Sequence, residues 1–395
     1  MSLRFVSTVC LAVAIAAPAC ASFKGDGGTS GGGDGGGANA DGSGSGSGDA
    51  STSSGDGSGG DGEGPLSDAC TLPGCKSACD GASCEGPGDA CAGNPACTPA
   101  CQGSACVTTA VLFAGDDSAL APTDTWTYAA SAWDNPRPSS APPHRTESAM
   151  AMLAGKVVLF GGSPSGQGDV SQDTWTWDGT TWTAEHPAHV PPSRNYHSMA
   201  TLGGTVVLVG GSDGTHPIAD TWTWDGVDWT QHVTAQPPPR EAAMMATLGR
   251  TVVLFGGLGG TSGNTELSDT WTWDGTNWTS LTLPVAPTAR DSGIAVTLHG
   301  HVVLFGGQDV NAAALADTWT WDGSNWSQVM NLTLSPPARL GAAAAAVGGK
   351  LVMFGGTTNN SNDFNDTWIW DGAVWIQGPS SGPGGRSYST MAGPG

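Results

Sequence analysis

The chain has 395 residues, of which only 12% are charged, and it contains 62 glycines and 26 prolines. So much Gly and Pro excludes a predominantly helical protein and favours a turn-rich, all-β chain. The formal net charge of −22 repels phosphate backbones, so we expect no nucleic-acid partner.

The first residues are typical of an export signal. Arg4 forms a short basic region, and the apolar run that follows, residues 5–17, is shorter than a membrane-spanning helix. Two cleavage sites compete. One is a small-x-small signal peptidase site ending at Ala21, and the other resembles a bacterial lipobox that would make Cys20 the lipidated first residue. We therefore expect residues 1–21 to be a signal peptide. The mature protein would be secreted, or be an outer-membrane or cell-surface lipoprotein whose lipid is its only membrane contact.

Two segments without a hydrophobic core come next. Residues 22–68 are mostly Gly, Ser and Asp, cannot bury enough apolar surface to fold, and are predicted to be a disordered linker. Residues 69–107 hold eight cysteines in two copies of one spacing pattern. In an oxidising compartment these cysteines predict four disulfides of unknown connectivity, and zinc is the alternative. The segment is a spacer, a small binding module or a cap. The cysteines are Cys70, Cys75, Cys79, Cys84, Cys91, Cys97, Cys101 and Cys106.

From residue 108 onward one unit recurs about every 46–50 residues, a period that indicates a repeat architecture. Its first mark is an apolar run closed by two glycines, as in residues 157–162. Its second mark is Asp-Thr-Trp-Thr-Trp-Asp-Gly, as in residues 173–179, followed by a further tryptophan, here Trp182. Its third mark is an arginine that opens a strand of small residues, as in residues 194–200.

Each unit predicts one four-stranded antiparallel sheet. The arginine segment is strand A, the apolar run strand B, the Asp-Thr-Trp segment strand C, and the segment from the last tryptophan strand D. Because side chains alternate along a strand, Trp175 and Trp177 share one face, and large indoles suit the space between stacked sheets. The pair Asp178-Gly179 is a hairpin turn signal between strands C and D.

These marks resemble the kelch family, in which a diglycine closes strand B, an aromatic lies on strand C and a tryptophan on strand D. The resemblance covers residues 108–395 and implies a six-bladed β-propeller. The chain departs from the family by using Trp where Tyr is common on strand C. The first unit lacks a strand A, and the chain ends with one, residues 386–392. We expect this last strand to complete the first blade and close the ring.

The antiparallel strands place the B–C and D–A loops on one face of the propeller. The B–C loops differ in every unit, and variable loops on a rigid scaffold are where binding sites are usually placed. Two residues after each repeated arginine the side chain also varies, at the expected mouth of the central channel. The candidate ligand-binding residues are Glu147, Tyr196, Asp213, His216, Asn264, Glu266, Asp309, Asn311, Asn359, Asp363 and Tyr388.

The repeated arginines have two interpretations. One is a cationic ring that captures an anionic ligand. The other, which we favour, is structural: each arginine pairs between blades with a carboxylate or a carbonyl, and the aspartate that opens strand C is the expected partner. The six are Arg145, Arg194, Arg240, Arg290, Arg339 and Arg386.

The sequence predicts a non-catalytic, monomeric binding module that acts outside the cytoplasm on an extracellular or cell-surface protein or glycan. One alternative is a sugar-processing enzyme similar to the sialic-acid epimerases of this family, with Glu147, Arg145 or His197 at the channel. Another is a structural envelope or adhesion protein. No cysteine follows Cys106, so the copper-radical site of related oxidases is not expected. We expect no cofactor, no metal and no catalytic residues.

Overall fold

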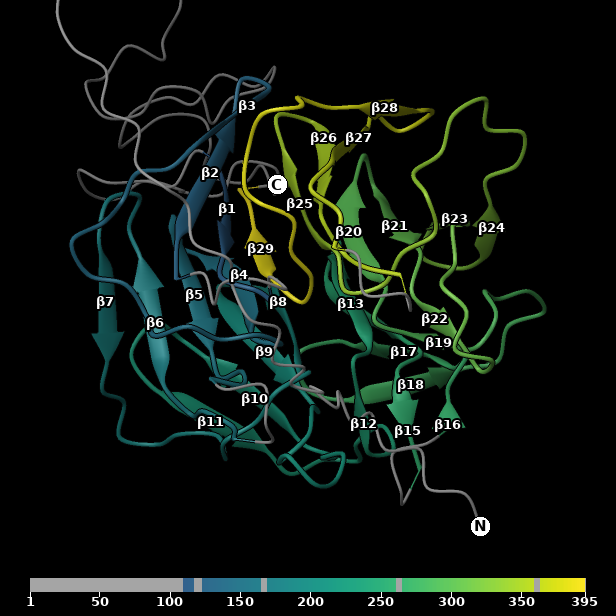
Figure 1. Ribbon diagram of the computed structural model, residues 1–395. Helices are drawn as coiled ribbons and strands as arrows, with labels where there is room; N and C mark the ends of the chain where they lie inside the picture. The colour runs from purple at the N-terminus through teal and green to yellow at the C-terminus, as the bar shows by residue number, and fades with distance from the viewer. Residues whose placement is uncertain (1–108, 117–122, 165–168, 261–264, 359–362, 395) are drawn as a thin grey trace, which may run out of the picture. The chain divides into compact units, whose positions relative to one another are not determined.

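The structure is a computed structural model that describes residues 109–116, 123–164, 169–260, 265–358 and 363–394 (Figure 1). The chain divides into residues 1–65 and residues 66–395, and every described residue belongs to the second unit. The predicted signal peptide, linker and cysteines therefore lie outside the described residues. In the described ranges every regular element is a β-strand, and no helix there is long and apolar enough to cross a membrane.

The strands form eight antiparallel sheets, as the all-β prediction requires. Six of them have four strands, and we number these sheets along the chain. Sheet 1 contains β29 (Thr390–Ala392), β1 (Ala110–Phe113), β2 (Thr125–Ala129) and β3 (Ala132–Asp134); sheet 2 contains β4 (Ala149–Leu153), β5 (Lys156–Phe160), β6 (Thr174–Trp177) and β7 (Trp182–Glu185); sheet 3 contains β8 (Ser198–Leu202), β9 (Thr205–Val209), β10 (Thr221–Trp224) and β11 (Trp229–His232).

The remaining sheets follow the same order. Sheet 4 contains β13 (Met244–Leu248), β14 (Thr251–Phe255), β17 (Thr270–Trp273) and β18 (Trp278–Leu281); sheet 5 contains β20 (Ile294–Leu298), β21 (His301–Phe305), β23 (Thr318–Trp321) and β24 (Trp326–Gln328); sheet 6 contains β25 (Ala343–Val347), β26 (Lys350–Phe354), β27 (Thr367–Trp370) and β28 (Trp375–Gln377). There are also two short sheets. One contains β12 (Arg240–Glu241), β15 (Leu258–Gly259) and β16 (Thr265–Glu266), and the other contains β19 (Arg290–Asp291) and β22 (Gln308–Asp309).

The second strand of each sheet is buried on both faces, because each sheet packs between two others. In sheet 2, Leu159 joins a hydrophobic cluster with Phe113 of sheet 1. Its neighbour Phe160 points to the other face and joins a cluster with Leu208 of sheet 3. This explains why the run is apolar at every position and does not alternate with polar residues.

Tryptophans fill the space between sheets and carry a hydrogen bond across it. Trp182 of sheet 2 is buried against Trp177, and its indole Nε1 donates to Thr125 Oγ1 of sheet 1 at 2.9 Å. The equivalent bond joins each sheet to the preceding one, and Trp133 of sheet 1 donates to Thr367 of sheet 6. The other four pairs are Trp229–Thr174, Trp278–Thr221, Trp326–Thr270 and Trp375–Thr318.

In sheets 2 to 6 a diglycine follows the second strand and allows close contact of main chains. Gly161 and Gly162 have φ of 61° and 100°. A Cβ atom would lie 2.6 Å from Arg194 O at Gly161, and 2.7 Å from Thr146 O at Gly162. The amide of Gly162 instead donates to Arg194 O at 2.9 Å, which ties sheet 2 to the start of sheet 3. A side chain at Gly161 would push sheet 3 away, and one at Gly162 would collide with the chain that leads into the first strand of its own sheet.

The C-terminal strand β29 lies beside β1, with Met391 opposite Leu112 (Figure 1). This pairing and the indole–threonine bond from Trp133 to Thr367 are what a ring closed by the last strand requires. A closed six-bladed ring stays a prediction, which truncation tests.

Deletion of residues 386–395 should lower the free energy of unfolding by more than about 3 kcal/mol. It exposes the edge of β1 and leaves a carboxylate without its buried partner. Urea unfolding followed by tryptophan fluorescence measures the change. Deletion of residues 394–395 alone leaves β29 intact and is the control. Equal stability of the two truncated chains would contradict closure.

Candidate functional site

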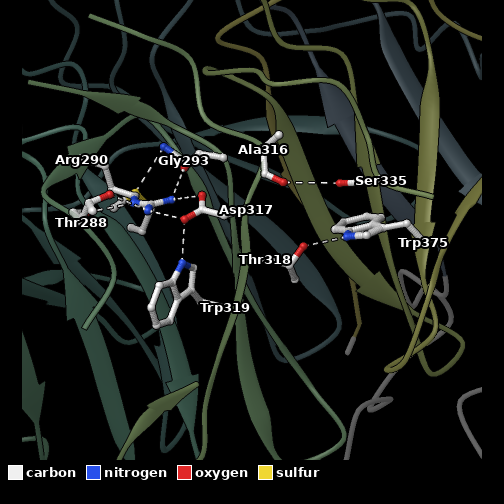
Figure 2. Close-up of polar contacts among 11 residues, drawn as sticks. Thr288, Arg290, Gly293, Ala316, Asp317, Thr318, Trp319, Ser335 and Trp375 are labelled. Atoms are coloured by element: carbon white, nitrogen blue, oxygen red, sulfur yellow. Dashed lines mark hydrogen bonds and ion pairs between the residues drawn. The ribbon is translucent and has the colours of Figure 1, made fainter. Parts of the chain in front are cut away.

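Each repeated arginine is buried and bound on all sides, as Arg290 illustrates (Figure 2). Its Nη1 and Nη2 donate to the two carboxylate oxygens of Asp317 at 2.6 and 2.7 Å. Nη1 also donates to Gly306 O, and Nε donates to Thr288 O. Trp319 Nε1 donates to the same carboxylate at 2.7 Å. The guanidinium is therefore fully used inside the protein and is not available to an anionic ligand.

Burial alone would raise the pKa of Asp317, but the hydrogen bonds and charge of Arg290 hold that pKa below its usual value. The aspartate was predicted as the partner, but the pair lies within one repeat unit and not between two, because Arg290 comes shortly before the first strand of sheet 5 and Asp317 comes directly before its third strand. The six pairs are Arg145–Asp173, Arg194–Asp220, Arg240–Asp269, Arg290–Asp317, Arg339–Asp366 and Arg386–Asp124.

Replacing Arg290 by Met should destabilise the protein by about 3–5 kcal/mol, because Asp317 is left as a partly buried charge without its partner. The exposed Arg250 lies in a turn, and Arg250→Met should cost less than about 0.5 kcal/mol. Urea unfolding of both variants gives the comparison. A loss at Arg290 as small as that at Arg250 would contradict the structural role.

Two residues beyond each arginine, the main chain forms a closed cycle of hydrogen bonds. The amide of Glu147 donates to the carbonyl of Tyr388, and each of the other members likewise donates to the member of the preceding sheet, at 2.7–3.0 Å. All six have left-handed φ between 50° and 61°, which is uncommon for residues other than glycine. Such strain often marks functional positions. The six are Glu147, Tyr196, Ala242, Ser292, Gly341 and Tyr388.

The side chains of this cycle line a cavity of about 120 Å³, which we call the mouth cavity. Large and small side chains occupy separate halves of it. Tyr388, Glu147 and Tyr196 are consecutive in the cycle, and the two tyrosine rings meet edge to face at 5.8 Å. The other half has Ala242, Ser292 and Gly341. A Cβ atom at position 341 would lie 3.0 Å from the Tyr388 ring, so a side chain there would require the ring to move.

One carboxyl group, Glu147, lines the mouth cavity, and two more, Glu241 and Asp291, come one residue before lining residues; none of the three has a basic partner in the ion pairs found among the described residues. Burial raises the pKa of Glu147, although its carboxylate accepts from Asn195 Nδ2 at 2.8 Å. Burial also raises the pKa of Glu241, with help from the charges of Asp291 and Glu147. Asp291 is 7% exposed, and burial together with the charge of Glu266 raises its pKa to about 6.

Two further polar side chains line the same cavity and are almost fully buried. His197 is 5% and Ser389 is 8% exposed. Within the described part of the chain, the two ring nitrogens of His197 have no hydrogen-bond partner, and the Oγ of Ser389 has none. Burial and the charge of Arg194 lower the pKa of His197 to about 3, and the nearby main chain of Phe160 opposes this only in part. The imidazole is therefore neutral near pH 7.

Comparison with known proteins supports the repeat interpretation. Residues 90–257 match the family model described as the KLHDC2/KLHL20/DRC7 Kelch-repeats domain. Kelch repeats are therefore shown for this part of the chain. A search of the curated proteins found no match. The kelch marks continue beyond residue 257, since sheets 5 and 6 have the same strand order and the same Arg–Asp pairs.

The kelch propeller brings together only part of the predicted ligand-binding set. Glu147, Tyr196 and Tyr388 meet at the mouth cavity. Asp213 and Asp309 lie in B–C loops, but their carboxylates accept main-chain amides of their own loops and so hold those loops in turns.

The other predicted residues are spread over the loops. His216 and Asn311 belong to the turns that Asp213 and Asp309 hold. Glu266 ends β16 and acts on the mouth only through its charge on Asp291. Asp363 forms an isolated bridge with Thr357. Asn264 and Asn359 lie outside the described residues.

Sequence reasoning missed Glu241, Asp291 and Ser389. They lie one or three positions after a repeated arginine, and attention to the residues beside the variable position would have found them. Among the described residues, no three His, Cys, Asp or Glu side chains lie close enough together to hold a metal ion.

Asp291→Asn should stabilise the kelch propeller at pH 7.5. A pKa of about 6 in the folded state, against 3.8 in the unfolded chain, means that folding costs free energy once both states are ionised. The raised pKa corresponds to a destabilisation of the folded state by at most about 3 kcal/mol. This destabilisation is fully present above pH 6 and is lost as the pH falls towards 3.8. Urea unfolding should show a gain at pH 7.5 that largely disappears at pH 4. The exposed Asp134→Asn is the matched control. No gain at pH 7.5 would contradict the buried charge.

Proposed function

We propose that this kelch propeller is a non-catalytic module that binds a protein partner at the mouth cavity, on the face of the B–C and D–A loops. Kelch-repeat domains are typically interaction modules, which supports the proposal. The observation that carries it is a contrast between equivalent positions. The Arg, Asp, Trp and Thr of every unit are identical and bonded to one another, whereas the residues two positions after each arginine differ in size and charge.

The position of these variable residues also favours binding. They are held in left-handed conformations by the hydrogen-bonded cycle, so their side chains are presented on a rigid frame. A preorganised site loses little entropy when it binds. Bulky side chains fill one half of the cavity, and the part beside Ala242 and Ser292 is where a partner side chain has room.

We also propose that the partner is extracellular or on a cell surface. The basic residue and apolar run at the N-terminus support export, with anchoring through Cys20 as one form of it. The predicted linker and Cys-rich segment would then place the propeller away from the envelope.

The test is selection of a phage-displayed random peptide library on the full chain, with a glycan array in parallel. Ala242→Tyr fills the open half of the cavity with a side chain that the cycle already holds at Tyr196 and Tyr388. Ala373→Tyr makes the same change in an exposed turn between the third and fourth strands of sheet 6, and is the matched control.

We expect selected peptides whose affinity falls at least about tenfold with Ala242→Tyr and stays unchanged with Ala373→Tyr. Thermal melts establish that both variants are folded. Peptides that bind both variants equally would overturn the mouth as the site. Binding only on the glycan array, sensitive to Ala242→Tyr, would replace the protein partner by a sugar.

A further inference from the structure

The mouth cavity has a chemical character that the repeat does not require. Glu147 lines the cavity, Glu241 and Asp291 come one residue before the lining residues Ala242 and Ser292, and the other sheets have neutral residues at the matching positions. The charges of Glu241 and Asp291 reach the mouth, because burial raises the pKa of Tyr196 with help from Glu241 and raises that of Tyr388 with help from Asp291. Negative charge is therefore concentrated around the cavity.

These carboxyl groups have no cation of their own. The six repeated arginines are bound to the strand-C aspartates, and Glu147, Glu241 and Asp291 have no part in the ion pairs of the described residues. Each affects the pKa of a neighbour at the mouth, which shows that their charges act on one region. Leaving like charges buried together costs free energy, and a positive ligand would relieve that cost.

Unused hydrogen-bond acceptors point to the same kind of ligand. His197 and Ser389 line the cavity, are more than nine-tenths buried, and leave their ring nitrogens and hydroxyl without partners in the described part of the structure. A neutral imidazole has one nitrogen that accepts, and a serine hydroxyl also accepts. An ammonium group donates three hydrogen bonds, so it can use a carboxylate and both of these acceptors.

The aromatic half of the cavity is also suited to a cation. Tyr196 and Tyr388 meet edge to face at 5.8 Å beside Glu147. A cation near the face of a tyrosine ring is attracted by the ring's electrons. A metal ion is a poorer candidate, because no three acidic or histidine side chains of the described residues converge at ligand distance. The size of the cavity favours an ammonium group on a flexible stem, which is a lysine side chain.

We propose that the mouth cavity binds the side-chain ammonium of a lysine on the partner protein, between the Tyr196–Tyr388 pair and the carboxylate of Glu147, with the charges of Glu241 and Asp291 adding attraction from outside the lining. This inference rests on the proposed function and names the group that the partner inserts. The affinity of the ammonium comes from charge-assisted hydrogen bonds inside the cavity, and not from the overall charge of the chain.

The probe is the peptide acetyl-Gly-Gly-Lys-Gly-Gly-amide, titrated into the full chain at 150 mM salt and followed by NMR. The same peptide with Nε-acetyl-lysine removes only the positive charge. Glu147→Gln and Asp291→Asn keep the size of the side chain and remove its charge, and Asp134→Asn makes the same charge change on the outermost strand of sheet 1. The chain carries a net charge of −22, which attracts any cationic peptide. This control therefore distinguishes binding in the cavity from that non-specific attraction.

We expect saturable binding that weakens at least about threefold in each mouth variant, about tenfold in the double variant, and less than about 1.5-fold in Asp134→Asn. The acetylated peptide should bind at least about tenfold more weakly. Equal affinity of the two peptides, or equal effects of mouth and control variants, would overturn the ammonium site. If that happens while selected peptides remain sensitive to Ala242→Tyr, the lysine inference fails and the proposed function stands.

Discussion

The bidentate bond between a buried arginine and the aspartate of the third strand is the contact on which each kelch unit depends. In sheet 5 it joins Arg290 to Asp317, and Asp317 in turn accepts from Trp319 (Figure 2). The carbonyl of Arg290 meanwhile accepts from Gly257 of the preceding sheet. One residue thus fixes the third strand of its own sheet and the distance to the preceding sheet. A buried ion pair is weak evidence of net stabilisation, but its geometry specifies a single arrangement.

That arrangement determines what happens two residues later. With the arginine fixed on both sides, the chain turns through a left-handed conformation before the first strand begins, and the amide at that position reaches the carbonyl of the equivalent residue in the preceding sheet. The cycle is formed by main-chain atoms alone. It therefore constrains the backbone and leaves the side chain free to vary, which is how Glu147, Ala242 and Gly341 occupy equivalent places.

Much of this could be predicted from the sequence, because the contacts recur in register. The diglycine, the tryptophans and the Asp-Gly turns identified the strands, and one Arg per unit with one Asp per unit identified the pair. What the sequence could not tell is whether a polar side chain is used locally. Asp309 looks like a free loop carboxylate, but it accepts two amides of its own loop. Asp291 resembles an ordinary charged neighbour of Arg290, and only the packing around it shows that it is buried without a basic partner.

The mouth cavity differs from the Arg–Asp pairs of the propeller in how its charged groups are satisfied. Elsewhere every repeated arginine and strand-C aspartate has a charged partner within hydrogen-bond distance. At the mouth, Glu147 and Glu241 are half-buried and Asp291 is buried, all without a basic partner among the described residues, and the imidazole of His197 and the hydroxyl of Ser389 are buried without a hydrogen-bond partner there. Proteins rarely leave buried polar groups unsatisfied where only stability is at stake. The net charge of −22 draws cations towards the surface from a distance, but a diffuse field cannot choose among them. Selection has to come from the short-range acceptors inside the cavity, so the residues that weaken the fold are those that give the site its specificity.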